Sequence, residues 1–278
     1  MDIIDAQVHL NSFGSKGALG AMRALGIAGV MVDEYTGVEG EKLKPYVVAP
    51  GNVPRPVQPW AENMALNHPD QICYLIRLDY RDPDLEAIVR LASASPGAKA
   101  LRICVLFPSE VEAFKADRHR RIFEIADRYQ LPLFANVRQI ELLAPYYGEF
   151  RNAKIIIDHC GLPVDIDFKP SDERLDVVLS LARYPNAYFK FAHAPTMLGG
   201  QQFPFTEMNS KLRRIVDAFG ANRVMWASDA TEAIGGYTWA ESLLYIKGNP
   251  ELSGEEKEWI LGRTAREVLG WPIPAAAA

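Results

Sequence analysis

The sequence predicts a (β/α)8 TIM barrel with an extra C-terminal helix. Short apolar runs recur along the chain, each followed by a polar residue and then by a stretch with helical periodicity, which is typical of βα units. Eight such runs are present, the number of strands that a closed barrel needs. The length of 278 residues lies near the roughly 250 typical of this fold. Because no linker divides the chain, we expect one domain over residues 1–278.

The predicted strands are rich in Ile, Val, Leu and Phe. Their units average about 32 residues, long enough for the right-handed crossover that joins parallel strands. An open doubly wound sheet shows the same alternation, but the count of eight and the lack of a G-x-G-x-x-G motif after the first run favour the barrel. The strands are expected at residues 2–8, 28–33, 71–78, 99–106, 131–136, 153–158, 187–192 and 223–228.

Helices are expected between the strands, where apolar residues return at i+3 and i+4. Residues 84–92 and 117–129 show this pattern clearly. A last helix begins at Ser253, where Ser-Gly-Glu-Glu fits a capping box, and continues to about Leu269 before Gly270 and Pro272 end it. We expect this last helix to cover one end of the barrel.

Three connections are expected to lie over the face that carries the carboxyl ends of the strands. The longest, residues 36–59, holds five prolines and no clear element, and long loops in compact domains are usually functional. We expect this connection, together with residues 194–206 and 230–238, to form a lid over the site. Aromatic side chains in these connections predict an apolar wall for the site: Tyr35, Tyr46, Phe203, Phe205 and Tyr237.

Composition excludes several classes of partner. The net charge is −5 and Lys and Arg are scattered, so nucleic acid is not expected. No apolar stretch approaches about 18 residues and the N-terminus has no signal core, which predicts a cytoplasmic protein without a membrane span. The three cysteines lie in apolar runs, as expected of buried thiols. The expected partner is a small-molecule substrate, and the sequence leaves open whether the chain forms a homo-oligomer.

Polar residues cluster where the predicted strands end, which is where β/α barrels carry their active sites. His9, His159 and Asp229 end the first, sixth and eighth strands and are the candidate catalytic residues. We expect His68 and His119 to lie on the surface, because they fall in or beside helical stretches. The candidate substrate-binding residues at other strand ends are Gln7, Arg77, Arg102, Arg138, Lys190 and His193.

The segments around three of these strand ends resemble motifs of a known family. They are Ile3–His9, Ile156–Pro163 and Arg223–Asp229. They are similar to strand motifs of the amidohydrolase superfamily, in the amidohydrolase family 2 or lactonase branch, which includes pyrone dicarboxylate lactonase and sugar lactonases such as fuconolactonase. Residues 78–84 and 100–102 are also similar to that branch, so the resemblance covers nearly the whole chain. It implies a barrel hydrolase and leaves the substrate open.

Two residues depart from the pattern that the resemblance implies. The superfamily has His-x-His in strand 1, where both rings bind a divalent metal, but Gln7 replaces the first ring, and a carboxamide is a weak zinc ligand. We therefore favour a site without a metal; the alternative is a single divalent metal such as Zn²⁺ at His9, His159 and Asp229. In strand 7, Ala192 replaces the serine of the family's Lys-x-Ser segment. Lys190 and His193 lie three residues apart, so on an ideal strand their side chains point to opposite faces. Both face the site only if the strand ends between them. Of the two, we favour Lys190 as the substrate-binding residue.

The resemblance implies hydrolysis of a lactone or a similar cyclic ester of a carboxylate-bearing or aromatic-derived compound, and the residue types fit this reaction. Asp229 would take a proton from water, and His9 and His159 would polarise the carbonyl. Arg102 and the other cations would hold a substrate carboxylate. Cys160 is expected to pack, because neighbours on a strand point to opposite faces. Alternatives are a metal-dependent nonoxidative decarboxylase, a lactone isomerase and a barrel that only binds a ligand.

Overall fold

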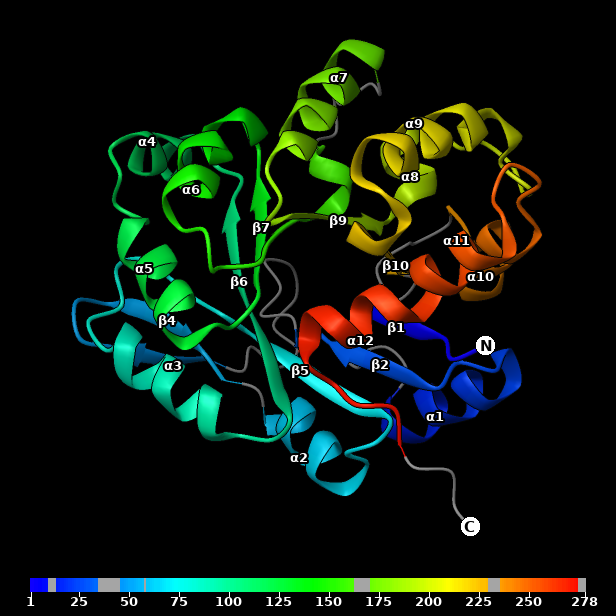
Figure 1. Ribbon diagram of the computed structural model, residues 1–278. Coiled ribbons are helices and arrows are strands. Elements are labelled where there is room, and N and C mark those ends of the chain that lie inside the picture. The colour runs from blue at the N-terminus through cyan, green and yellow to red at the C-terminus, as the bar shows by residue number, and fades with distance from the viewer. Residues whose placement is uncertain (10–13, 35–45, 58, 163–170, 230–235, 275–278) are drawn as a thin grey trace.

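Eight parallel strands form one sheet that curls into a nearly closed barrel with helices around it (Figure 1). The computed structural model describes residues 1–9, 14–34, 46–57, 59–162, 171–229 and 236–274. The order of the strands in the sheet follows the chain, as in a (β/α)8 TIM barrel, and confirms the predicted fold. The barrel strands are β1 (Ile4–Val8), β2 (Gly29–Val32), β5 (Ile72–Arg77), β6 (Ala98–Val105), β7 (Leu133–Val137), β8 (Ile155–Ile157), β9 (Ala187–Ala192) and β10 (Val224–Ala227).

The helices lie outside the sheet, between consecutive strands and, for the last three, after β10. Each predicted helical stretch is helical in the structure, with ends shifted by a few residues. No described helix is long and apolar enough to cross a membrane. The described helices are α1 (Gly14–Leu25), α2 (Pro59–Asn67), α3 (Leu85–Ala94), α4 (Pro108–Lys115), α5 (Arg120–Tyr129), α6 (Ala144–Glu149), α7 (Asp172–Ser180), α8 (Ala194–Leu198), α9 (Asn209–Phe219), α10 (Trp239–Gly248), α11 (Gly254–Glu258) and α12 (Thr264–Leu269).

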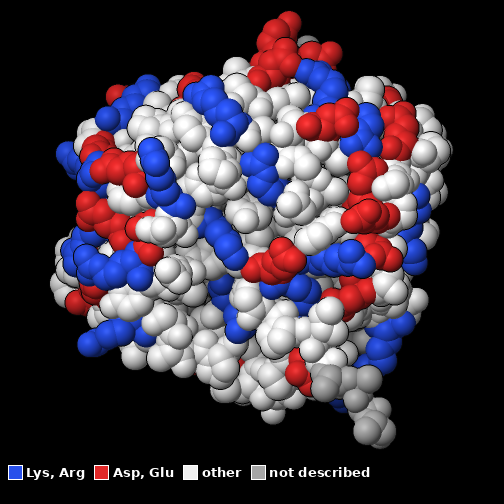
Figure 2. All heavy atoms as spheres, viewed as in Figure 1, with Lys and Arg blue, Asp and Glu red and all other residues white. Residues whose placement is uncertain are grey.

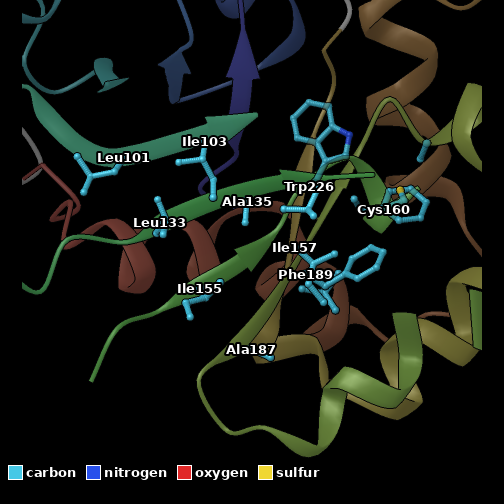
Figure 3. Packing of buried hydrophobic residues seen from close by; sticks show 14 of the residues in the cluster. Leu101, Ile103, Leu133, Ala135, Ile155, Ile157, Cys160, Ala187, Phe189 and Trp226 are labelled. Atoms are coloured by element: carbon cyan, nitrogen blue, oxygen red, sulfur yellow. The ribbon is translucent and has the colours of Figure 1, made fainter. Parts of the chain in front are cut away.

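The outward faces of the strands bury rows of apolar side chains beneath the helices (Figure 3). One row runs across four neighbouring strands through Leu101, Leu133, Ile155 and Ala187, and the next row lies one pleat further along. The side chains alternate along each strand, so these rows hold the register of the sheet. A one-residue slip of any strand would bring its interior residues to the helices.

The interior of the barrel is apolar at one end and polar at the other. Its apolar part includes Ile4, Met31, Phe134 and Met225, and all four side chains are fully buried. Side chains of α12 and Trp271 belong to the same cluster and close this end of the barrel, as predicted for the last helix. The strands then reach a layer of charged and polar residues at their carboxyl ends, which forms the candidate site.

The C-terminal helical segment lies directly on the first strand. Between α11 and α12 the helix makes a π-helical turn over Trp259–Arg263. A Cβ on Gly262 would lie 1.9 Å from the backbone oxygen of Asp2, so only glycine allows this close approach. Sequence periodicity gives no sign of such a turn, but the helical segment as a whole begins and ends where it was predicted, after Ser253 and at Leu269.

The barrel is closed between β10 and β1 by a few specific hydrogen bonds instead of a regular ladder. The backbone N–H of Asp229 donates to the carbonyl of Gln7 at 3.1 Å. The buried carboxylate of Asp5 accepts from the backbone N–H of Ser228 at 2.9 Å and from Trp239 Nε1 at 2.7 Å. Asp5 therefore ties β1 to β10 and to helix α10 beside the end of the barrel that carries the site.

The proline-rich connection after β2 contains an element that the sequence did not predict. The strands β3 (Tyr46–Ala49) and β4 (Val53–Pro56) form an antiparallel hairpin. Arg55 holds the hairpin against the connection after β5 through hydrogen bonds to Asp82 at 2.7 Å and to Asp84 at 2.6 Å. The predicted lid residues 36–45 and 230–235, and Tyr35, lie outside the described part of the chain.

The charged side chains on the face seen in Figure 2 are of both signs and are mixed. Elsewhere on the described surface, exposed side chains of opposite sign pair with each other, such as Arg128 with Glu86 and Arg214 with Asp176. Neither sign of charge dominates this face. The mixture agrees with the scattered charges of the sequence.

Candidate active site

Three strand-end side chains meet at the mouth of the barrel. Asp229 follows β10, His159 follows β8 and His9 follows β1. His9 Nε2 lies 3.0 Å from Asp229 Oδ1, and His159 Nε2 lies 3.0 Å from Asp229 Oδ2. The carboxylate thus lies between two imidazole rings, and all three side chains are at least nine-tenths buried. The structure brings together the three residues predicted to be catalytic.

A bulge in β1 points two side chains into the site. Asp5 pairs with Val30 and Val8 with Val32, so β1 has one residue more than β2 over this stretch. Before the bulge Ile4 and Ala6 belong to the interior cluster, whereas after it Val8 belongs to the outer cluster. Gln7 and His9 therefore both reach the interior polar network of the barrel.

Left-handed backbone conformations turn the side chains at the ends of three other strands. His159, His193 and Asp229 have φ angles of 47°, 53° and 50°. Residues other than glycine adopt this region rarely, and such residues concentrate at functional sites. The strand β9 has ended before His193, so Lys190 and His193 both face the site, which is the condition stated above for their opposite parity.

The surroundings of Asp229 favour its ionised form. Burial raises the pKa of its carboxyl, but the hydrogen bonds from His159 and His9 more than offset this effect and hold the pKa well below its usual range. Gln7 Nε2 donates a further hydrogen bond to Asp229 Oδ1 at 3.1 Å. Asp229 is therefore a carboxylate at neutral pH.

His159 lies between two carboxylates. Its Nδ1 is 2.8 Å from Asp158 Oδ1, and its Nε2 faces Asp229. Burial lowers the pKa of His159, but the negative charge of Asp158 and the hydrogen bonds to both carboxylates outweigh it, so the pKa is raised. The ring therefore holds its second proton to higher pH than an ordinary histidine and can donate from Nε2.

His9 is oriented by the backbone of the neighbouring strand. Its Nδ1 lies 2.5 Å from the carbonyl oxygen of Asp33, which can only accept, so Nδ1 carries a proton. The other nitrogen, Nε2, lies near Asp229 Oδ1 and 3.2 Å from the Gln7 amide nitrogen. The direction of both His rings is thus fixed by oxygen acceptors behind them.

A network of buried ions lies beneath this trio. Arg77 binds Asp33 through two hydrogen bonds of 2.7 Å, and Arg102 also contacts Asp33. Arg102 Nε lies 2.8 Å from Asp158 Oδ2, in an ion pair without hydrogen-bond alignment. Lys190 Nζ lies 2.6 Å from Asp158 Oδ1. Each of these three predicted substrate-binding cations therefore already faces a carboxylate of the protein.

Gln7 connects Lys190 to Asp229. Its Oε1 accepts from Lys190 Nζ, which can only donate, and this contact fixes the orientation of the amide. The amide nitrogen therefore points at Asp229 and His9. Asp158 and Asp33 also lie at strand ends, but the sequence alone assigns them no role, because nothing local indicates which distant cation they meet.

The remaining predicted positions differ in exposure. Arg138 follows β7 and its side chain is exposed, whereas Arg77 is 16% exposed and Lys190 is fully buried. Cys160 is buried and its thiol faces the carbonyl of Ala192, as predicted for a packing residue. His68 is half-buried. Phe205 is buried with its ring 6.1 Å from that of Tyr245, so it packs in the core instead of forming a wall of the site.

The prediction that His119 lies on the surface was wrong. The residue is 3% exposed, and its ring lies 4.4 Å from that of Tyr80 and 5.0 Å from that of Phe114. His119 precedes α5, and a polar residue at such a position is usually solvated. Here Tyr80 from the connection after β5 and Phe114 from α4 cover the ring.

The donor types of the trio suit one divalent metal ion, and each ring has the oxygen acceptor behind Nδ1 that metal-bound histidines usually have. In the structure, however, Asp229 contacts both rings directly. Among the described residues, no group of three or more His, Cys, Asp or Glu side chains is arranged to hold a metal ion. The trio therefore offers suitable ligands for a single ion, but the Asp229 carboxylate lies between the two rings in the structure.

Comparison with known proteins places these features in a family. A family model described as amidohydrolase matches residues 48–271, which confirms the family expected from the motifs. A search of curated proteins gives no match. Solved structures similar to this chain share 17% sequence identity or less with it in the cases below, so they show the fold alone.

Three of these structures span nearly the whole chain. An amidohydrolase from Burkholderia multivorans, solved with bound zinc, is 16% identical with a TM-score of 0.72 and covers 98% of this chain and 100% of its own. A Pseudomonas putida protein assigned as a 2-pyrone-4,6-dicarboxylic acid hydrolase is 17% identical, with a TM-score of 0.72 and coverages of 98% and 99%. A dihydroxybenzoic acid decarboxylase from a Polaromonas species, solved with manganese and an inhibitor, is 10% identical, with a TM-score of 0.62 and 97% coverage of both chains.

Proposed function

The chain belongs to the amidohydrolase family, and we propose that within this family it hydrolyses a lactone or a similar cyclic ester of a small carboxylate-bearing or aromatic-derived compound. The observation that carries this proposal is the Asp229 carboxylate, which lies 3.0 Å from a ring nitrogen of His9 and of His159 at the barrel mouth. Ester hydrolysis needs a base for water and donors for the developing oxyanion. This trio supplies both.

Asp229 is the base in the proposed reaction. While both rings bond to it, its low pKa makes it a weak base. When the carbonyl oxygen of a substrate takes over the hydrogen bond of a ring, Asp229 loses a stabilising partner and its pKa rises. Binding of the substrate therefore strengthens the base at the moment when the base is needed.

His159 stabilises the negative charge on oxygen, whereas the proton of a neutral His9 ring lies on Nδ1 and bonds to the Asp33 carbonyl. Water adds to the carbonyl carbon while its proton passes to Asp229, and the carbonyl oxygen becomes an oxyanion that accepts from the Nε2–H group of His159. The intermediate then breaks its ring C–O bond, and the leaving alkoxide takes the proton from Asp229. The net reaction adds one water to the lactone and gives a hydroxy acid, with Asp229 again ionised.

The buried ions set the charge of the site. The carboxylates Asp33, Asp158 and Asp229 balance the cations Arg77, Arg102 and Lys190 when the histidines are neutral. A proton on His159 makes the site positive by one, which suits an anionic substrate. We propose that Arg102 and Lys190 act mainly through this balance, and that the more exposed Arg77 and Arg138 contact a substrate carboxylate.

A single divalent metal ion is part of the proposal as an alternative to the metal-free site favoured by the sequence. Structures with bound zinc and manganese among the similar folds support this alternative over none. His9, His159 and Asp229 would hold the ion, with Asp229 moving from its contacts with the rings. When bound, such an ion would polarise a carbonyl and lower the pKa of a water.

Nonoxidative decarboxylation of an aromatic acid is the second candidate. It is favoured by the similarity of the fold to dihydroxybenzoate decarboxylases from Rhizobium and from a Polaromonas species, each 10% identical. Release of CO₂ from dihydroxybenzoates would identify this reaction. The trio accounts for hydrolysis more directly, because its carboxylate and its ring donors perform the two tasks of that reaction.

A screen of lactones with a pH indicator tests the proposed function, because each turnover releases a carboxylic acid. We expect acid release from at least one lactone class with the native chain and none above background with Asp229→Asn. The same plate with a chelator separates metal-dependent from metal-free hydrolysis. Failure of a broad lactone panel, with CO₂ release from a dihydroxybenzoate, would overturn the proposal in favour of decarboxylation.

A further inference from the structure

A cavity lies at the end of the barrel opposite to the candidate active site, where the strands begin. Its volume is about 340 Å³, which lies in the range of roughly 300–1,000 Å³ typical of small-molecule sites. The start of β6, the connections before β7 and β8, and the ends of α3 and α12 form its walls. The described residues that line it are 93–96, 98–99, 130–132, 154 and 268–270, and none of them belongs to the trio or to the buried ions beneath it.

The charged side chains that line this cavity have one sign. They are Lys99 and Lys154, and no Asp or Glu is among the described lining residues. Leu131, Pro132 and Leu269 give the walls an apolar part. Two like charges without an opposite charge beside them are unfavourable, and a concave surface of one sign attracts counter-ions. The lining therefore favours an anion that also carries an apolar group.

Lys154 is only partly compensated by the protein. Its Nζ donates to the backbone oxygens of Glu267 at 2.9 Å and of Val268 at 3.4 Å, so it caps the end of α12. Burial lowers the pKa of Lys154, although the charge of Glu267 acts in the opposite direction. An ammonium group has three donors, and the contacts within the described residues use two of them. One donor of Lys154 is left for a bound molecule.

Lys99 has no such structural partner. Tyr74 pairs with Ala98 and Leu75 pairs with Ala100, so Lys99 is the extra residue of a bulge in β6. The side chain is half-buried, and within the described ranges it makes no hydrogen bond or ion pair. A half-buried ammonium loses part of its hydration, and a carboxylate in the cavity would replace what is lost. The bulge thus gives the cavity a cation whose donors are all unused.

We propose that this cavity binds a small organic carboxylate with a short apolar chain, which Lys99 and Lys154 hold through its carboxylate group. Phosphate is disfavoured, because proteins bind phosphate at helix N-termini. The helices α3 and α12 instead reach the cavity with their C-terminal ends, and Gln130 is the C-terminal cap of α5. The site lies at the other end of the barrel from Asp229, so the proposal does not depend on the proposed lactonase activity.

Amide NMR spectra of the full chain, recorded during titration with butyrate, test the proposal. Butyrate has one carboxylate and a short apolar chain, and butyramide has a similar shape without the charge. At physiological ionic strength, where exposed charges are largely screened, we expect butyrate to cause saturable shifts of the backbone amides of Lys99, Gln130 and Gly270. Butyramide should leave these signals in place.

Replacement of Lys99 identifies the group that binds. Lys99→Met keeps most of the apolar stem and removes the charge. A hydrogen bond to a charged group accounts for about a tenfold or larger change in affinity, so the Kd of butyrate should rise by about this factor. Lys99→Arg should retain most of the affinity. Lys115→Met removes a 42% exposed lysine of α4 outside the cavity and is the control that should leave Kd unchanged.

The other outcomes separate this site from the barrel mouth. Asp229→Asn should bind butyrate in the cavity as the native chain does, whether or not the native chain hydrolyses lactones. The proposal is wrong if butyrate and butyramide shift the same amides equally, or if neither causes saturable shifts at the cavity. Shifts confined to amides near Asp229, or a Kd that is unchanged in folded Lys99→Met, also overturn it. Inorganic phosphate that binds in the cavity as tightly as butyrate would contradict the assigned class of ligand.

Discussion

Lys190 Nζ lies 2.6 Å from Asp158 Oδ1 in the interior of the barrel, and neither side chain is exposed to solvent. The same carboxylate oxygen lies 2.8 Å from Nδ1 of His159. One atom therefore holds a buried cation of β9 and orients a ring of the candidate site. Burial lowers the pKa of Lys190, whereas Asp158 raises it. Stability of the barrel and geometry of the site are coupled through this pair.

Replacement of Lys190 by Met is expected to destabilise the protein strongly. Methionine fills much of the same space but leaves Asp158 with less compensation for its buried charge, and loss of one partner of a buried pair costs about 3–5 kcal/mol. Urea unfolding followed by circular dichroism would measure the loss.

Arg128→Met is the matched control, because Arg128 pairs with Glu86 at the surface and its side chain is 61% exposed. We expect the control to change the free energy of unfolding by less than about 1 kcal/mol. Equal effects of the two substitutions would contradict the role given to the buried pair.

Replacement of Asp229 by Asn should remove the base while keeping its size. The amide cannot take a proton from water, and general-base catalysis contributes about 10²–10⁴-fold, so kcat for lactone hydrolysis should fall by this factor. Stopped-flow measurement of acid release gives kcat, and Glu112→Gln, a 72% exposed site on α4, serves as the control for a generic change of charge. Hydrolysis by folded Asp229→Asn at the native rate would show that another group activates the water.

The strands and the positions of the site residues could be predicted from the sequence because both follow local rules. Apolar runs mark buried strands, and the polar residue after each run lies at one end of the barrel. The direction of the side chains could not be predicted. The bulge that brings Gln7 into the site and the left-handed turn at His193 break the alternation on which such a prediction depends.

The pairing of the buried ions could not be predicted from the sequence either. Arg102 was predicted to hold a substrate carboxylate, and the structure places it between Asp33 and Asp158, two carboxylates from other strands. The hairpin of β3 and β4 was missed because its Pro54 and Pro56 argue against a strand. Those prolines are tolerated because the hairpin is a separate two-stranded sheet and not part of the barrel.

Metal titration should give a stoichiometry of one divalent ion per chain at most. The trio supplies donors for a single ion, and Gln7 stands where the resemblance implies a further histidine ligand. Isothermal titration with Zn²⁺, with elemental analysis of the purified chain, measures the stoichiometry. His9→Ala should abolish this site, whereas His68→Ala, outside the barrel mouth, should leave it. Two tightly bound ions per chain, or one that persists in His9→Ala, would contradict this assignment of the ligands.

Acid should destabilise the fold partly through His119. Burial of the ring between Tyr80 and Phe114 lowers its pKa to about 4, although the charge of Asp79 acts in the opposite direction. In the unfolded chain the ring has an ordinary pKa near 6.5, so between pH 6.5 and 4 the unfolded state binds more protons than the folded state. The stability that the neutral His119 ring contributes is therefore fully present above pH 6.5 and is lost as the pH falls toward 4.

His119→Phe keeps an aromatic ring in the same space without a group that titrates. Urea unfolding at pH 7.0, 6.0, 5.0 and 4.5 should show a smaller loss of stability on acidification for His119→Phe than for the native chain. Parallel pH profiles for the two proteins would mean that the buried ring takes up its proton as readily in the folded state as in the unfolded one.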